Sequence, residues 1–258
     1  MEFEHFTLNV TDDIAVFTVN RPQVRNAMNE ACWKELSAFL DWVDQTPTLK
    51  AVIITGAGEK AFVAGADINF LKERTMVSAL EVLAQRTLRK LAACKLPVIA
   101  AVNGYAFGGG CELAMACDIR ISSEKAAYAL PELGLGILPA GGGTQRLAKL
   151  VGVGRAKEMI LTGRIVKAAE ALAMGLTTKV VAPEELMDAA FETARCIAQK
   201  GPFAVRLAKQ AVNAALSTDE DTGMMIEALS YGLVIASDDR MEGVTAFLEK
   251  RTPEFSGH

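Results

Sequence analysis

The chain has 258 residues, 51% of them hydrophobic, a size that one large α/β domain or two small ones would fill. The formal net charge is −4 and the basic residues are scattered, so the sequence lacks the basic stripe typical of nucleic-acid-binding proteins. No apolar run approaches the roughly 18 residues that a membrane-spanning helix needs. We therefore expect neither nucleic acid nor a membrane as a partner.

Histidine and cysteine content narrows the possible chemistry. Only His5 and His258 are present, each near a chain end. A Ser-His-Asp or Cys-His nucleophile system needs an imidazole in the site, and a zinc site usually includes a histidine ligand. Histidines at the two chain ends therefore disfavour both kinds of site. The five cysteines form no Cys-x-x-Cys pair and are typical of small buried side chains in a reducing compartment. In an enzyme of this sequence, proton transfer therefore falls to carboxylates, Lys, Tyr or Cys, and we expect no metal.

The first part of the chain predicts strands that alternate with helices. Met1–Glu4 is acidic, which is typical of neither a signal peptide nor a transit peptide, so we expect a cytoplasmic protein. Hydrophobic periodicity predicts a hairpin over residues 5–10 and 13–19, helices over 26–44 and 80–94, and buried strands over Ala51–Thr55 and Pro97–Val102. Apolar strands that alternate with helices indicate parallel pairing with right-handed crossovers.

From about Pro183 the pattern changes to one helix after another. The predicted helices cover residues 184–200, 202–216, 220–236 and 238–250, and no strand is predicted after them. We therefore divide the chain into a core with the active site, residues 1–182, and a C-terminal helical region, residues 183–258. Such a terminal block can cap the core or pack against other subunits.

Three segments use glycine where a packed strand or helix would not: Ala61–Ile68, Asn103–Ala114 and Leu130–Thr144. In the second, three consecutive glycines follow a strand and open a helix. This arrangement lets backbone N–H groups approach a ligand and directs the positive end of a helix dipole at it. Each segment alone also fits a tight turn or a helix entry. Glu112 alone fits a carboxylate that complements the helix dipole, and Glu132 alone fits an exposed loop residue.

Together the three segments resemble the crotonase (enoyl-CoA hydratase/isomerase) superfamily. The matching stretches are AFVAGAD at 61–67, NGYAFGGGCELAMACD at 103–118 and LPELGLGILPAGGGTQRL at 130–147. The resemblance extends from NRPQVRNAMN at 20–29 to DDRMEGVTAFLEKRTPEF at 238–255. It implies an α/β fold, a crotonase-like spiral of ββα units with a C-terminal helical trimerisation region, in a homotrimer or a dimer of trimers.

The resemblance also implies a reaction and its central residues. Hydratases of this family add water across the C2=C3 bond of a 2-trans-enoyl-CoA to give a 3-hydroxyacyl-CoA, in fatty-acid β-oxidation or related acyl-CoA degradation. The backbone N–H groups of Ala66 and Gly109 would form the oxyanion hole for the thioester oxygen. Glu112 would activate the water and Glu132 would protonate C2. The partners are then the acyl-CoA substrate and water, and no cofactor is expected because coenzyme A is part of the substrate.

The contacts to CoA and the acyl group are assigned by the same resemblance. They are Val24, Arg25, Ala27, Ala64, Asp67, Ile68, Tyr105, Phe107, Gly108 and Pro131, with Tyr231, Phe247 and Lys250 matching positions where a neighbouring subunit reaches the CoA. Asn69 stands where many hydratases have a lysine, a departure that affects one phosphate or adenine contact. Phe70–Val82 follows the oxyanion loop, and its apolar side chains, including Leu80, would either border a short-to-medium acyl chain or pack in the core.

Three alternatives stay open at this point. Within the family, the protein could be an isomerase or a hydratase for a branched substrate such as methylglutaconyl-CoA, although the two glutamates favour hydration. A non-catalytic CoA-binding or RNA-binding relative would have lost Glu112 or Glu132, and both are present. A thioesterase would release a free thiol, whereas hydration leaves the thioester intact and removes the conjugated double bond.

Overall fold

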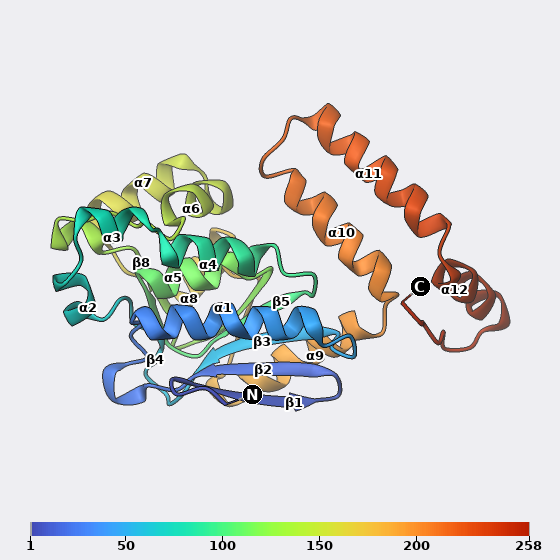
Figure 1. The fold of residues 1–258 in the computed structure, drawn as a ribbon, viewed down its shortest axis with the longest axis horizontal. Helices are drawn as coiled ribbons and strands as arrows, with labels where there is room; N and C mark the ends of the chain where they lie inside the picture. Colours follow the sequence, from blue (N-terminus) through green and yellow to red (C-terminus); the bar gives the residue numbers. More distant parts are fainter. Residues whose placement is uncertain (1, 258) are drawn as a thin grey trace.

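Two β-sheets form the centre of the protein in the computed structural model, which describes residues 2–257 (Figure 1). The larger sheet has six strands in the order β1 (Phe6–Thr11), β2 (Ile14–Val19), β3 (Ala51–Gly56), β5 (Val98–Val102), β7 (Ile119–Ser123) and β10 (Lys179–Val181). The smaller sheet has four short strands in the order β4 (Ala61–Val63), β6 (Tyr105–Phe107), β8 (Ala127–Ala129) and β9 (Val166–Lys167). β1 and β2 form the predicted antiparallel hairpin, and the other neighbours in the larger sheet pair in parallel.

Successive strands along the chain alternate between the two sheets. β3 is followed by β4, β5 by β6 and β7 by β8, and in each pair the first strand joins the larger sheet and the second joins the smaller. Helical segments follow each pair: α2 (Ile68–Lys72), α3 (Met76–Leu80) and α4 (Leu83–Ala92); then α5 (Gly109–Ala116); then the 3-10 turn η2 (Glu132–Leu135), α6 (Gly143–Val151) and α7 (Val153–Thr162). This arrangement confirms the expected spiral of ββα units.

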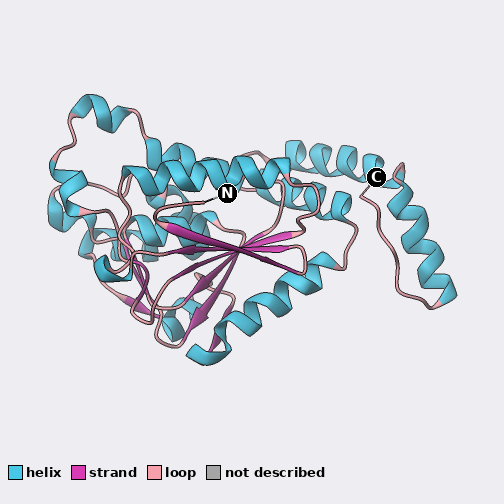
Figure 2. Cartoon of the chain, turned by 60° about the horizontal axis from the view of Figure 1, so that its bottom comes forward, coloured by secondary structure: helices cyan, strands magenta, loops and turns pink. Residues whose placement is uncertain are grey.

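The central strands of the larger sheet are covered on both faces. Every residue of β3 and β5 is buried, as expected for parallel strands between two layers of helices. Alternate side chains point to opposite faces. Val52 and Ile54 pack in one cluster with α1 (Glu30–Gln45), whereas Ile53 packs in another with α9 (Leu186–Ala198). Figure 2 shows the strands fanned out between these helices.

The first long helix, α1, begins four residues later than the sequence predicts, at Glu30 rather than residue 26. Arg25 and Asn26 have φ angles of 54° and 59°, and left-handed residues cannot continue a right-handed helix. The helix starts where Asn29 caps it, since the Asn29 side chain accepts a 2.9 Å hydrogen bond from the Cys32 N–H. The buried Asn26 side chain instead donates to the Ala61 carbonyl at 2.8 Å, which holds this loop beside β4.

The helix predicted over residues 80–94 is present as α4, which begins three residues later and ends two residues earlier, because α3 and α4 are separate helices. Val82 lies between them with φ 47°, an unusual and strained conformation for a β-branched residue. α3 is exposed, with Met76 and Leu80 at 77% and 71% accessibility, whereas α4 buries Leu88 and Leu91 in the core. The break at Val82 therefore separates an exposed segment from an anchored one.

All four predicted C-terminal helices are present: α9, α10 (Pro202–Ala214), α11 (Glu220–Ile235) and α12 (Asp238–Glu249). α9 buries four residues against the larger sheet, while α11 buries none. α10 to α12 extend away from the core and form what we call the arm, residues 202–249 (Figure 1). The division at residue 182 stays a prediction. Within residues 2–257, no helix is both long and apolar enough to cross a membrane.

One ion pair ties the arm to the core. Lys209 of α10 lies 2.7 Å from the Asp118 carboxylate and also donates to the Leu96 carbonyl at 2.9 Å. The Asp118 carboxylate accepts a further hydrogen bond, 2.7 Å long, from the Val98 N–H. Because Val98 is the first residue of β5, this carboxylate links the arm directly to a central strand.

Replacing Gly110 with alanine should destabilise the fold, because α5 approaches β4 too closely to admit a side chain. A Cβ at Gly110 would lie 1.9 Å from the Val63 carbonyl oxygen, so the backbone of β4 would have to move. Overpacking of this kind costs about 1–3 kcal/mol or more. Urea unfolding followed by circular dichroism should show a lower midpoint than the wild type.

Gly154→Ala is the matched control. Gly154 is exposed on α7, and a Cβ there would meet no other part of the chain within 4 Å. At such a site alanine stabilises by about 0.4–1 kcal/mol, so the midpoint should stay the same or rise. A Gly110→Ala midpoint equal to that of the wild type would contradict the close approach of α5 to β4.

Candidate active site

The three glycine-rich segments meet because each follows one of three parallel strands of the smaller sheet. β4 pairs in parallel with β6, and β6 with β8, so their carboxyl ends lie at one edge. Residues 64–67 follow β4, residues 108–112 follow β6 and residues 130–132 follow β8. This edge is the candidate active site.

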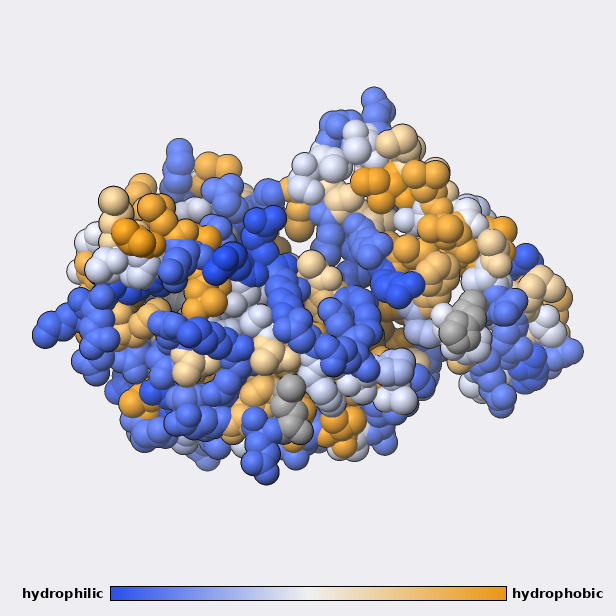
Figure 3. Space-filling model, viewed as in Figure 1, coloured by the Kyte–Doolittle hydropathy of each residue, from blue (hydrophilic) through white to orange (hydrophobic). Residues whose placement is uncertain are grey.

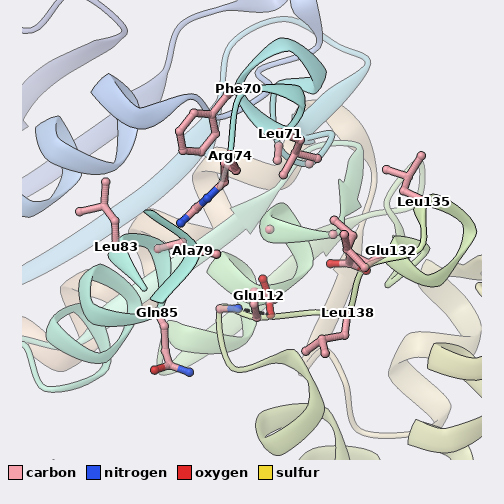
Figure 4. Close-up of a pocket in the computed structure, with 18 of the residues that line it drawn as sticks. Phe70, Leu71, Arg74, Ala79, Leu83, Gln85, Glu112, Glu132, Leu135 and Leu138 are labelled. Atoms are coloured by element: carbon pink, nitrogen blue, oxygen red, sulfur yellow. Dashed lines mark hydrogen bonds between the residues drawn. The ribbon is translucent and has the colours of Figure 1, made fainter. Parts of the chain in front are cut away.

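A cavity of about 600 Å³ opens at this edge, a volume typical of small-molecule sites (Figure 4). Figure 4 shows Glu112 and Glu132 approaching it from two different segments. Most of the remaining wall is apolar and includes Ile68, Phe70, Leu71, Met76, Ala79, Val82, Leu83, Leu135, Ile137 and Leu138. The expectation for Leu80 is wrong, because this side chain lies outside the wall and is exposed. The cavity can hold an apolar group beside two carboxyls.

Two backbone N–H groups at the cavity have no backbone acceptor among residues 2–257, so they can bind the oxygen of a ligand. Gly109 is the first residue of α5, so its N–H has no acceptor within the helix and lies at the positive end of the dipole. Ala66 forms a parallel bridge with Met28, in which the hydrogen bonds are made by the neighbours of Ala66 on either side. The N–H of Ala66 itself is therefore left facing away from Met28. Both residues line the cavity.

The turn into α5 requires glycine at Gly108. This residue has φ 51° and ψ −123°, a conformation that glycine adopts far more readily than other residues. A Cβ at Gly108 would also lie 3.2 Å from Glu132 Oε1. Glycine at this position thus lets the segment after β8 bring Glu132 close to the start of α5.

Glu112 is a buried carboxyl held by two backbone donors. It lies on the first turn of α5 and is 4% exposed. Its Oε1 accepts hydrogen bonds from the N–H groups of Gly141 and Gly143, each 2.7 Å long. Burial raises the pKa of Glu112, while these two donors and the positive charge of Arg146 act in the opposite direction. The donors favour the ionised form and fix the orientation of the carboxylate.

Glu132 has a contrasting environment. It starts η2, and its buried Oε2 has no hydrogen-bond partner among residues 2–257. Burial is the main reason that its pKa is raised to about 7, and the negative charge of Glu112 adds to the effect. A carboxyl with this pKa is partly protonated at neutral pH. The pair can therefore accept a proton at Glu112 and donate one from Glu132.

Some of the residues assigned to CoA and the acyl group line the cavity, and others do not. Those that do are Ala64, Ile68, Gly108 and Pro131. Asp67 lies outside the wall, where it caps α2 by accepting from the Asn69 N–H and forms an ion pair with Arg21. Tyr105 and Phe107 stack on each other along β6, with ring centroids 5.0 Å apart.

The remaining assigned residues do not line the cavity of one subunit. Val24, the last residue of the 3-10 turn η1 (Pro22–Val24), Arg25 and Ala27 belong to the loop that precedes α1. Tyr231 and Phe247 are exposed on the arm, and Lys250 follows its last helix. Within one subunit none of these residues lines the cavity, so their roles toward CoA stay predictions.

Several residues at the site were missed from the sequence. In the sequence, the glycines at 141–143 fit a helix entry. The N–H contacts of Gly141 and Gly143 to Glu112 depend on the packing of α5 against α6. Trp33, Arg74 and Leu83 of the cavity wall, and Arg146 behind it, carried no sequence signal of their own.

Metal-ligand atoms gather elsewhere, at Glu4, His5 and Glu35. There His5 Nδ1 lies 2.7 Å from Glu35 Oε1, and the backbone N–H of His5 donates to the same carboxylate. These contacts join the start of the chain to α1. None of the three residues lines the cavity, so the group has no place in the chemistry of the site.

Comparisons with known proteins agree with the fold. A family model described as enoyl-CoA hydratase/isomerase matches residues 9–258. The short-chain-enoyl-CoA hydratase of Clostridium acetobutylicum is 46% identical over 98% of each chain, and the crotonyl-CoA hydratase of Syntrophomonas wolfei is 47% identical over 99% of each. The crystal structure of an enoyl-CoA hydratase from Bacillus anthracis has a TM-score of 0.95 at 42% identity, covering 99% of this chain and 100% of that one. The chain therefore belongs to the enoyl-CoA hydratase/isomerase family.

Proposed function

We propose that the protein is an enoyl-CoA hydratase that converts a 2-trans-enoyl-CoA and water into a 3-hydroxyacyl-CoA. The observation that carries the proposal is the pair of carboxyls at one cavity: two N–H groups hold Oε1 of Glu112, whereas Oε2 of Glu132 has no hydrogen-bond partner among residues 2–257. The names of two relatives, short-chain-enoyl-CoA hydratase and crotonyl-CoA hydratase, support short enoyl groups as substrates. Chemistry of this kind uses no cofactor beyond the CoA of the substrate.

The proposed reaction uses each of the four central groups once. The N–H groups of Ala66 and Gly109 bind the thioester oxygen and stabilise the negative charge that develops on it. Ionised Glu112 takes a proton from water as the water oxygen bonds to C3. The electron pair of the double bond moves toward the thioester, and Glu132 gives its proton to C2. Glu112 ends protonated and Glu132 ionised, so one proton must return between them before the next turnover.

A metabolic role and a location follow as further proposals. A hydratase for short enoyl groups would serve fatty-acid β-oxidation or a related degradation of acyl-CoA. This role rests on the substrate class alone. The cytoplasmic location expected from the sequence likewise stays a prediction.

Changing either glutamate to glutamine should lower hydration by about 10²-fold or more, because glutamine cannot exchange the required proton. Glu112→Gln and Glu132→Gln would be assayed with crotonyl-CoA, following both the loss of the conjugated absorbance and any free thiol. The double variant should be much less than multiplicatively worse, because the two groups act as one unit. Glu124→Gln, on the exposed turn between β7 and β8, is the matched control and should keep full activity.

The pH dependence gives a second outcome of the same assay. Because Glu132 must be protonated and its pKa in the free protein is about 7, kcat/KM of the wild type should fall as the pH rises through this value. Full activity of Glu132→Gln would reduce the proposal to family membership alone. Release of thiol by the wild type would point to a thioesterase, and a shifted double bond without hydration would point to an isomerase.

The apolar wall should limit the acyl group to short or medium length. Leu83→Ala should raise kcat/KM for a long-chain enoyl-CoA relative to crotonyl-CoA by about ten-fold, since added apolar contacts have effects of that order. Leu80→Ala is the matched control, because Leu80 lies nearby but outside the cavity wall. Wild-type activity that rises steadily out to very long chains would contradict this specificity.

We also propose that the chain assembles as a homotrimer or a dimer of trimers through the arm. α11 exposes a group of large apolar side chains, among them Met224, Met225, Leu229, Tyr231 and Leu233. Figure 3 shows apolar surface over this part of the arm. Exposed apolar patches of this kind are characteristic of protein interfaces. In such an assembly Tyr231, Phe247 and Lys250 could reach the CoA bound to a neighbouring subunit.

Leu229→Glu should weaken this assembly, because a carboxylate would have to be buried in an apolar interface. Sedimentation equilibrium at micromolar concentration should give a trimer or hexamer for the wild type and smaller species for the variant. Leu172→Glu is the matched control, since Leu172 is a partly exposed leucine on α8 (Ala168–Ala173), outside the arm. A wild-type monomer would contradict the proposal.

A further inference from the structure

Arg146 lies between the loop that holds Glu112 and the helix that lines the cavity. Its Nη1 donates to the Gly141 carbonyl at 2.8 Å, and its Nη2 donates to the Leu88 carbonyl at 3.2 Å. The N–H of Gly141 is one of the two donors to Glu112, and Leu88 is buried in α4, whose first residue, Leu83, forms part of the cavity wall. A single guanidinium therefore joins the loop that holds the carboxylate to the wall of the cavity.

The guanidinium of Arg146 is partly buried, and its hydrogen bonds end on carbonyl oxygens rather than on a carboxylate. Burial lowers the pKa of Arg146, and the negative charge of Glu112 is the largest influence in the opposite direction. Withdrawing a cation from water is costly unless a negative charge compensates. The nearby charge that compensates Arg146 is that of ionised Glu112.

We propose that Arg146 is a positioning residue, which fixes the Gly141–Gly143 loop against α4 and so keeps the two N–H donors of this loop on the Glu112 carboxylate. Its positive charge adds to the effect of these donors in favouring the ionised form of Glu112. This inference rests on the proposed hydration. Arg146 does not line the cavity, so it acts through the two N–H groups that hold Glu112. Arginine suits the position because its planar fork reaches two carbonyls at once, whereas lysine offers a single nitrogen.

Arg146 is the cation whose charge acts on Glu112 in the part of the chain that the structure describes. Arg74 also lines the cavity, but its guanidinium lies over the Phe70 ring and donates to the Ser78 carbonyl. Four other titratable groups interact electrostatically with Glu112 or Arg146. They are Glu132 on η2, Cys111 on α5, Cys117 directly after α5 and Arg89 on α4. Glu132 can add only negative charge. The two thiols stay neutral because burial raises the pKa of each, to about 12 for Cys117. Arg89 acts on Arg146 by repulsion, which leaves Arg146 as the cation that favours ionised Glu112.

Two substitutions separate the charge from the hydrogen bonds. Arg146→Lys keeps the charge but cannot hold both carbonyls, and Arg146→Gln removes the charge as well. Lys149→Gln is the matched control, because it removes one positive charge from an exposed side chain on the same helix. Hydration of crotonyl-CoA by each protein would be measured across the pH range for kcat and KM, with circular dichroism to check folding.

Both Arg146 variants should lose kcat by about 10- to 100-fold at nearly constant KM, because small displacements of a catalytic group are costly. In the pH profile of kcat, activity falls on the acidic side as Glu112 becomes protonated. This acidic limb should move to higher pH in Arg146→Gln. The sign follows because a carboxylate that loses a nearby cation is protonated more easily. The limb should stay in place in Arg146→Lys, and Lys149→Gln should match the wild type in both respects.

Other outcomes would overturn the role of Arg146. One is a wild-type kcat in both Arg146→Lys and Arg146→Gln. The other is an acidic limb of the kcat pH profile that moves as far in Lys149→Gln as in Arg146→Gln. If Arg146→Gln does not fold, Arg146→Lys decides the matter: lower kcat at constant KM supports the positioning role, and wild-type kcat rejects it.

A second readout does not depend on hydration. Isotope-edited NMR of the glutamate carboxyl carbons, with Glu112 assigned by its loss in Glu112→Gln, should give a higher titration midpoint for Glu112 in Arg146→Gln than in the wild type. A wild type that does not hydrate crotonyl-CoA would reject the proposed function. An unshifted midpoint in an otherwise active enzyme would reject only the role of Arg146.

Discussion

Parallel pairing of the three short strands β4, β6 and β8 is the constraint on which the site depends. Parallel strands place their carboxyl ends at one edge, so segments far apart in the chain meet there. The contact between α5 and β4 at Gly110 then holds the start of α5 beside the end of the neighbouring strand. Two N–H groups and two carboxyls consequently line one cavity, although they come from three separate segments.

The surroundings of the two carboxyls, rather than their residue type, decide where a proton resides. Glu112 receives two N–H donors and the charge of Arg146, which oppose the effect of burial. Glu132 lines the same cavity, and its Oε2 has no hydrogen-bond partner in the described part of the chain, residues 2–257. Burial raises its pKa to about 7. The larger sheet contributes indirectly, because its buried strands anchor the connections that carry these segments.

The apolar pattern predicted the long elements well, because their period is set by side chains that pack in the core. The hairpin, both buried strands and the four C-terminal helices are confirmed. The predicted helix starts lie too early where the backbone leaves regular conformations, at Arg25 and Asn26 before α1 and at Val82 before α4. Strands β4, β6 and β8 were not predicted, because three residues are too few to show a period.

By itself, the sequence determined the α/β class, the three glycine-rich segments and, through its resemblance to one family, the pair Glu112 and Glu132 as candidates. Only the tertiary structure decided that the two carboxyls share a cavity, that Gly141 and Gly143 donate to Glu112, and that Arg146 stands behind them. The physical reason is that distances between remote segments, and the removal of a carboxyl from water, arise from the packing of whole elements. No local pattern of residues records either quantity.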